Sequence, residues 1–152
     1  MGYEIKQIEN ANIQCLITLA NEAKVEGFKF VQRAIDEWAD GTNSFSNAGE
    51  VLFGVFDKGK CVAIGGLNID PYSNDPNVGR VRHLYVSPGY RRRAIATGLL
   101  ELIIERAKKY FRILRLSAYK PGAANPEASK LYEEMGFVAG ERSKQTHVLY
   151  FK

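Results

Sequence analysis

The stretch HLYVSPGYRRRAIATGLL, residues 83–100, joins an apolar run to a helix through a short basic loop. Its first half closes at Pro88-Gly89, a pair typical of turns, and the apolar spacing beyond predicts a helix from about Thr97. Three arginines, residues 91–93, precede that helix, where free N–H groups and the helix dipole already favour an anion. Small residues at positions 94, 96 and 98 would let a phosphate approach the backbone. The pattern predicts a phosphate-binding loop, against the alternatives of a solvated charge cluster or a nucleic-acid patch.

Charge is distributed unevenly along the chain. Between Val78 and Arg115, ten Lys or Arg residues stand against two acids, a net charge of +8. Residues 21–50 instead carry six acids and three bases, a net charge of −3. Two segments of opposite charge suggest two different ligands.

The composition indicates an ordinary globular chain with a single domain, residues 1–152. Hydrophobic residues make up 45% and charged residues 25%, which suits a folded core and argues against disorder. No apolar run approaches the roughly 18 residues of a membrane span, and the N-terminus has no signal-peptide pattern. We therefore expect a cytoplasmic protein with no membrane partner. Cys15 and Cys61 are expected to be buried free thiols, and the scarcity of histidine and cysteine predicts no metal site.

Hydrophobic periodicity predicts a regular succession of strands and helices. Strands are expected at residues 3–9, 51–57, 60–70, 80–87 and 113–119, with two short ones within 137–152. Helices are expected at residues 10–27 and 28–41, from about 97, and at 126–136. This order implies a mixed α/β sheet with helices on both faces.

Two motifs in the second half of the chain resemble the signature regions of the GNAT superfamily of acyl-CoA-dependent N-acetyltransferases. The first family pattern is L-x-V-x-P-x-aromatic-R-x-x-G-x-G/A, and the second is N-x-x-A-x-x-L-Y followed by G-F. The matching residues are Leu84, Val86, Pro88, Tyr90, Arg91, Ala94 and Ala96, then Asn125, Ala128, Leu131, Tyr132, Gly136 and Phe137. The resemblance implies a GNAT-like α/β fold, with a mixed, mostly antiparallel central sheet of 6–7 strands and about four helices on its two faces.

The same resemblance implies an N-acetyltransferase that moves an acetyl group from acetyl-CoA, its cosubstrate, to a primary amine by direct transfer in a ternary complex. The pyrophosphate of coenzyme A would bind the backbone N–H groups of residues 92–97. The pantetheine arm would pair with the strand at Leu84 and Val86, and Asn125 would bind it near the thioester. The implied coenzyme-binding residues are Leu84, Tyr85, Val86, Arg91, Arg92, Arg93, Ala94, Ile95, Ala96, Thr97 and Asn125. A homodimer stays open.

Ala94 departs from the family pattern, which has glycine there. If the position requires a positive φ, an alanine costs about 1–2 kcal/mol. If φ is negative, the substitution is tolerated.

Tyr132 matches the family position whose phenol faces the coenzyme sulfur. A phenol is protonated at neutral pH, so it can protonate or hydrogen-bond the departing thiolate. The alternative is a tyrosine that only packs in the core.

The general base is not assigned by the motifs. Family members often have Glu or His on the fourth strand, where this chain has Arg80 and Arg82, and arginine cannot accept a proton. Strict alternation puts His83 on the other face of that strand, as a packed residue. Ordered water, Glu22 or Glu26 remain candidates.

The same residues suggest the class of acceptor. Arg80 and Arg82 on one strand face could bind a carboxylate, whereas Glu22, Glu26 and the acidic segment around them would attract an amine. An amino acid or a peptide terminus carries both groups.

Two other functions fit part of the pattern. A coenzyme-binding domain that senses acyl-CoA without turnover would explain Ala94 and the missing strand base. A nucleic-acid-binding module would explain the basic segment, but it needs aromatic residues on an exposed basic face. We therefore expect no nucleic acid among the partners.

Overall fold

The computed structural model describes residues 2–117, 126–139 and 146–151, and the side chains of residues 126–129 are not part of that description. Helices α1, α2, α3 and α4 span Leu16–Val25, Phe30–Asp40, Ile95–Tyr110 and Pro126–Glu134, with short 3₁₀ turns at Ile13–Cys15 and Pro88–Tyr90. Strands β1 to β7 span Glu4–Gln7, Val51–Asp57, Lys60–Ile69, Val78–Val86, Ile113–Leu116, Val138–Ala139 and His147–Tyr150. The predicted order of elements is confirmed. Gly41, at φ 84°, ends α2 as the sequence predicts.

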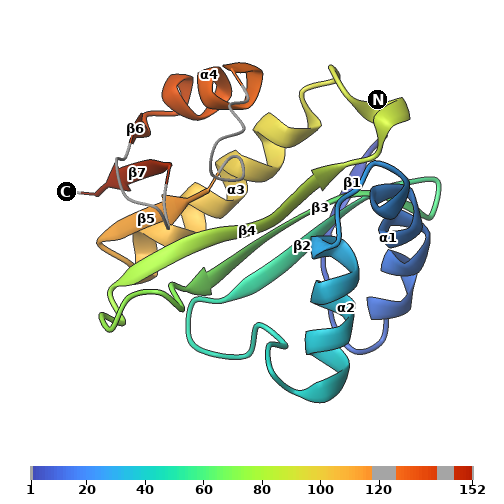
Figure 1. The fold of residues 1–152 in the computed structure, drawn as a ribbon, viewed down its shortest axis with the longest axis horizontal. Helices are drawn as coiled ribbons and strands as arrows, with labels where there is room; N and C mark the ends of the chain where they lie inside the picture. The colour runs from blue at the N-terminus through green and yellow to red at the C-terminus, as the bar shows by residue number, and fades with distance from the viewer. Residues whose placement is uncertain (1, 118–125, 140–145, 152) are drawn as a thin grey trace.

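The strands form one sheet in the order β1-β2-β3-β4-β5-β7-β6 (Figure 1). All neighbouring pairs are antiparallel except β4 and β5. The predicted fold, a mostly antiparallel mixed sheet with helices on both faces, is therefore confirmed.

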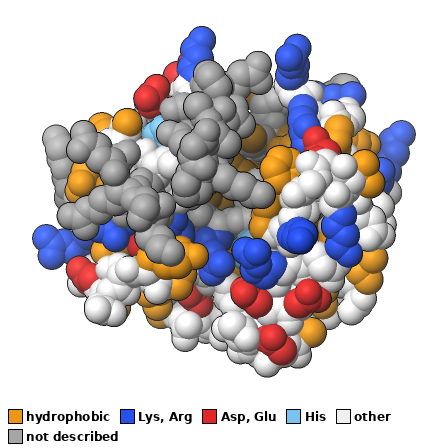
Figure 2. Space-filling model, viewed as in Figure 1, with side chains coloured by type: hydrophobic (Ala, Val, Ile, Leu, Met, Phe, Trp, Pro, Cys, Tyr) orange, Lys and Arg blue, Asp and Glu red, His pale blue; other side chains and the backbone are white. Residues whose placement is uncertain are grey.

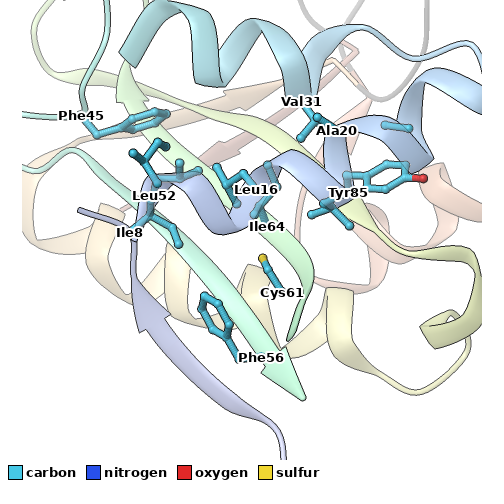
Figure 3. Packing of buried hydrophobic residues seen from close by; sticks show 13 residues of the cluster. Ile8, Leu16, Ala20, Val31, Phe45, Leu52, Phe56, Cys61, Ile64 and Tyr85 are labelled. Atoms are coloured by element: carbon cyan, nitrogen blue, oxygen red, sulfur yellow. The ribbon is translucent and has the colours of Figure 1, made fainter. Parts of the chain in front are cut away.

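The two sheet faces have separate apolar cores. On one face, α1 and α2 pack over Ile8, Leu52, Ile64 and Tyr85, the cluster drawn in Figure 3. On the other face, α3 packs its buried leucines and isoleucines over Leu67, Val81 and Leu114. Val81 and Tyr85 are four residues apart and would share a face in an unbroken strand, yet β4 contributes Tyr85 to the first core and Val81 to the second.

A β-bulge interrupts the alternation of β4. Arg82 pairs with Gly66 and Tyr85 with Ile64, so His83 and Leu84 together stand opposite Gly65. His83 has φ 57°, as one residue of a bulge often does. The extra residue turns the His83 ring toward Phe30 and Phe45, onto the α1/α2 face. The predicted placement of His83 on the face opposite Arg82 is therefore wrong, because alternation holds only in an unbroken ladder.

The pairing of β4 with β5 is short. It covers Val78, Gly79 and Arg80, and beyond Arg80 the strand continues to Val86 with no further strand on that edge in the described residues. Backbone N–H and C=O groups on an unpaired edge are available to an extended ligand. The bulge lies within this unpaired part of β4, and the basic loop follows the end of the strand.

Candidate active site

The loop before α3 presents backbone N–H groups in one direction. None of the N–H groups of residues 92–97 donates to an acceptor within the described parts of the chain, and the first helical hydrogen bond runs from Gly98 to the carbonyl of Ala94. Arg92 and Ala94 both have left-handed φ values, 63° and 61°. Left-handed residues in such a loop bring neighbouring N–H groups together into an anion-binding concavity. The loop has the geometry of a phosphate site at a helix N-terminus.

Ala94 occupies the N-cap position with φ 61° and ψ 16°. The position therefore requires a positive φ, one of the two alternatives left open by the sequence. In this conformation the backbone of an alanine is strained, whereas that of a glycine is not. The side chain is exposed, so it displaces no other residue.

The three arginines of the loop have different partners. Arg91 donates from both terminal nitrogens to the Glu26 carboxylate and from Nε to the carbonyl of Val86, at 3.0 Å. Arg93 lies over the Tyr90 ring and donates to the Tyr3 hydroxyl at 3.1 Å. Arg92 is exposed, and no ion pair involves it among the described residues. Arg92 and Arg93 therefore keep an unneutralised charge at the loop, and Arg91 does not.

The end of α1 is tied to β4 and the loop through two acids. Glu26 accepts a hydrogen bond from the Tyr85 hydroxyl as well as those from Arg91, and these hydrogen bonds hold the pKa of Glu26 below its usual value. Burial, with Glu26 as the second cause, raises the pKa of Tyr85. Glu22 accepts a hydrogen bond from the Ser87 hydroxyl at 2.9 Å. Glu26 is thus engaged within the chain through both carboxylate oxygens, whereas the second carboxylate oxygen of Glu22, Oε1, is buried without a hydrogen-bond partner among the described residues.

Arg80 and Arg82 share the α1/α2 face of β4 but have different surroundings. Arg80 is buried against Asp70, which also contacts Arg115, and its guanidinium lies 4.8 Å from the centre of the Tyr72 ring. Arg82 is half-buried and makes no ion pair among the residues that the structure describes. Of the two arginines predicted to bind a carboxylate, Arg82 alone has an uncompensated charge. Figure 2 shows a row of Lys and Arg side chains across the middle of this face.

Asp70 was not identified from the sequence. It follows β3 directly, ten positions before Arg80, on the other arm of the turn that joins β3 to β4. An acid at that place in an antiparallel pair could have been recognised as a cross-strand partner.

His83 is a poor candidate for the general base. Its ring is buried, and neither ring nitrogen has a hydrogen-bond partner among the residues that the structure describes. Burial, together with the nearby charges of Arg82 and Arg33, lowers the pKa of His83 to about 3. A base of this pKa holds a proton too weakly for efficient general-base catalysis near neutral pH.

Tyr132 belongs to α4 and packs into the core on the other face of the sheet, the face covered by α3. Its ring packs against Phe137 and His147, with ring centres 6.0 and 5.5 Å apart. Burial raises the pKa of Tyr132 to about 12, which keeps the phenol protonated at all ordinary pH values. Asn125 lies outside the described residues.

The remaining predicted contacts follow β4 and α3. Leu84 points to the α3 side, next to Leu99, and Ile95 is buried in the same cluster. Ala96 and Thr97 are half-buried in the first turn of α3, with their N–H groups free. The structure therefore brings residues 84–86 and 91–97 to one region, along the free edge of β4.

An open groove of about 380 Å³ lies on the outer side of α2, lined by Lys24, Lys29, Gln32, Arg33 and Asp36. It faces away from the buried residues Val31 and Ala34. Its lining is mainly basic, although it belongs to the segment whose net charge is negative. The groove includes none of residues 84–86 or 91–97.

Neither a cluster of metal ligands nor a membrane-spanning helix is found among the described residues. Within residues 2–117, 126–139 and 146–151, no three His, Cys, Asp or Glu side chains come together as a metal site would require. None of the helices described is long and apolar enough to cross a bilayer.

Comparison with known proteins gives the following matches. A family model described as the acetyltransferase (GNAT) family matches residues 13–137. A protein of known structure from Exiguobacterium sp. 255-15, assigned as an acetyltransferase, superposes with a TM-score of 0.83 at 26% identity, over 99% of this chain and 94% of that one. No curated protein sequence matches the chain.

Two other solved structures share the fold at lower identity. One is the ribosomal-protein-S18-alanine N-acetyltransferase from Escherichia coli, with a TM-score of 0.70 at 18% identity, over 97% of this chain and 90% of that one. The other is the PaiA N-acetyltransferase from Thermoplasma acidophilum in complex with coenzyme A, with a TM-score of 0.71 at 21% identity, over 99% and 100%.

Proposed function

The chain belongs to the GNAT acetyltransferase family and is therefore an acyltransferase, and from this we propose that it transfers the acetyl group of acetyl-CoA to a primary amine by direct attack within a ternary complex. The amine nitrogen bonds to the thioester carbonyl carbon, the carbon–sulfur bond breaks, and coenzyme A leaves as a thiolate that takes up a proton. The amine loses a proton in exchange.

The coenzyme site is supported by one observation above all. The N–H groups of residues 92–97 have no acceptor in the described chain, beside the unneutralised charges of Arg92 and Arg93. An unsatisfied helix N-terminus flanked by arginines is suited to a pyrophosphate. In this proposal the pantetheine arm lies along the free edge of β4 at Leu84, Tyr85 and Val86, and Asn125 contacts it near the thioester.

Tyr132 is proposed to supply the proton for the thiolate. Its raised pKa leaves the phenol protonated, as this role requires. No side chain on β4 is proposed as the base, because Arg80 is paired with Asp70 and His83 binds a proton too weakly. The amine would lose its proton through ordered water.

We further propose an acceptor that carries a carboxylate, such as an amino acid or a peptide terminus. Arg82 supports this, because it lies on the α1/α2 face of β4 with an uncompensated charge. Glu26 no longer supports it as a direct amine ligand, since its carboxylate is bonded to Tyr85 and Arg91, whereas Glu22 keeps one oxygen, Oε1, with no partner among the described residues.

Thiol release from acetyl-CoA, measured with a panel of amines, tests the activity. The panel pairs each amino acid with its carboxamide and adds polyamines and peptides. We expect thiol release with a free carboxylate on the acceptor and at least tenfold less with the matched amide, the discrimination expected from one charge-assisted hydrogen bond. Calorimetric binding of acetyl-CoA with no thiol release across the panel would instead favour a coenzyme-sensing domain.

A further inference from the structure

The α1–α2 linker, residues 26–29, is bonded to the basic loop, residues 91–93, through one ion pair. Glu26 is the first residue after α1, and its carboxylate accepts hydrogen bonds from Arg91, at the start of the basic loop, and from Tyr85 on β4. Arg91 in turn donates to the carbonyl of Val86 and lies over the Tyr85 ring, 5.5 Å from its centre. The Arg91 guanidinium thus contacts three groups, the Glu26 carboxylate after α1 and the Tyr85 ring and Val86 carbonyl of β4.

We propose that Arg91 is a positioning residue rather than a phosphate ligand: with Glu26 it fixes the α1–α2 linker over the face of β4 that receives the acceptor. The proposal rests on the proposed function in one respect, that residues 92–97 hold the coenzyme pyrophosphate.

The hydrogen bonds of Arg91 argue against a phosphate contact. Its Nε and both terminal nitrogens already donate, and its charge is neutralised by a bidentate carboxylate. A phosphate would have to displace Glu26, which would then lie beside Tyr85 with its charge unpaired. Arg92 and Arg93 carry no such ion pair in the described chain, and they are one and two residues nearer to the free N–H groups.

The linker covers the bulged face of β4 through its aromatic residues. Phe28 packs edge-on against Tyr85, with ring centres 6.3 Å apart, and Phe30, directly after the linker, stacks on His83 at 6.4 Å. Figure 3 shows Tyr85 at the end of the cluster beneath α1 and α2. Because Glu26 is the linker's charged anchor to β4, its bond to Arg91 determines how closely these rings approach the bulge.

The ion pair is not placed to stabilise the fold as a whole. The side chains of Arg91 and Glu26 are 42% and 28% exposed, so solvent screens their attraction. Variants of either residue should therefore fold, and the effect should be confined to the linker.

Acetyl-CoA affinity, measured by calorimetry, gives the first test. We expect Arg91→Gln to change the dissociation constant less than threefold and Arg92→Gln combined with Arg93→Gln to raise it about tenfold or more. If Arg91→Gln weakens binding as much as the Arg92/Arg93 pair, Arg91 is a phosphate ligand and the inference is wrong, while the coenzyme site stands. If neither variant weakens binding, the proposed phosphate site itself is wrong.

Amide hydrogen exchange of the linker gives the second test. The N–H groups of Gly27 and Phe28 donate to the carbonyls of Lys24 and Ala23, both at 2.9 Å, and report whether the linker is held. We expect Glu26→Gln and Arg91→Gln each to speed exchange at these amides by roughly tenfold, as for local opening, with no larger effect when combined. The exchanged pair, Glu26→Arg with Arg91→Glu, should restore much of the protection.

Lys24→Gln is the matched control, since Lys24 is exposed on the last turn of the same helix and belongs to no ion pair in the described residues. It should leave exchange at Gly27 and Phe28 unchanged. Equal exchange rates in wild type and in both single variants would overturn the inference. The inference would also fail if the exchanged pair left exchange at Gly27 and Phe28 as fast as in the single variants.

Discussion

The Nε of Arg80 donates to the Oδ1 of Asp70 at 2.8 Å, and the two side chains are only 5% and 0% exposed. Residue 80, one of the two β4 positions considered for a general base, thus belongs to a buried ion pair that joins β4 to the end of β3. A buried pair is costly to break from one side, because the remaining charge loses its partner in a site that water does not reach.

Arg80→Gln is therefore expected to lower the free energy of unfolding by about 3–5 kcal/mol, the usual effect of orphaning one member of a buried pair. Urea denaturation measures it, and acetyl-CoA affinity of the folded fraction should stay within twofold. Arg82→Gln, two residues along the same strand face, is the control and should change stability by less than about 0.5 kcal/mol. A small effect of Arg80→Gln would mean that Asp70 is satisfied by Arg115 alone.

Ala94→Gly is expected to stabilise the protein, by up to about 1 kcal/mol, because φ 61° strains an alanine and not a glycine. The higher entropy of glycine in the unfolded chain offsets part of the gain. Acetyl-CoA affinity should be unchanged or better, since a methyl group is removed from the loop.

Ala96→Gly supplies the comparison for Ala94→Gly, because Ala96 lies within the first turn of α3. There glycine should destabilise by roughly 0.5–1 kcal/mol, as in any helix. Thermal unfolding of the two variants should therefore shift in opposite directions. A loss of stability in both would show that the left-handed conformation at position 94 is not strained.

The motifs made the fold and the position of the basic loop before α3 predictable, because both are marked by residues close together in the sequence, whereas phosphate binding by that loop stays a prediction. The strand, turn and helix around residues 83–100 follow from local spacing, and the described structure has them in that order. The bulge at His83 was not predictable from alternation, because β4 is covered on both faces and its sequence has no strict polar and apolar alternation in which a change of phase would show.

Contacts between distant residues were not predictable either. Glu26 and Arg91 are 65 positions apart, and nothing in the sequence near either residue indicates that they meet. From charge alone, Glu26 was assigned to the amine acceptor and Arg91 to the coenzyme. In the fold, Glu26 instead neutralises the charge of Arg91.

His83 should make the protein sensitive to acid. Its pKa of about 3 in the folded chain lies below the ordinary value of 6.5, so between these values the unfolded chain binds the proton more tightly. The stabilising contribution is complete above pH 6.5 and is lost as the pH falls toward 3. At pH 5 the loss is about 2 kcal/mol from this residue.

Urea denaturation at pH 7 and pH 5 measures this loss in wild type and in His83→Asn. Asparagine suits the positive φ of residue 83 and does not titrate. The pKa of His147 is also lowered by burial, but His147 is present in both proteins and its contribution cancels in the difference. The variant should lose about 2 kcal/mol less than wild type between the two pH values, and an equal loss would show that His83 is not buried in its neutral form.

Tyr132→Phe tests the proton donor proposed for the departing thiolate. The substitution removes the hydroxyl and keeps the ring contacts with Phe137 and His147, so thermal stability and acetyl-CoA affinity should change little. Turnover should fall by roughly 10- to 10³-fold, the range for losing a general acid or one well-placed hydrogen bond. Because burial keeps the phenol protonated, with a pKa of about 12, wild-type turnover should not decline through Tyr132 ionisation below pH 10. Single-turnover thiol release separates chemistry from product release. A phenylalanine variant with full single-turnover rate would mean that water protonates the thiolate and that Tyr132 serves only the core.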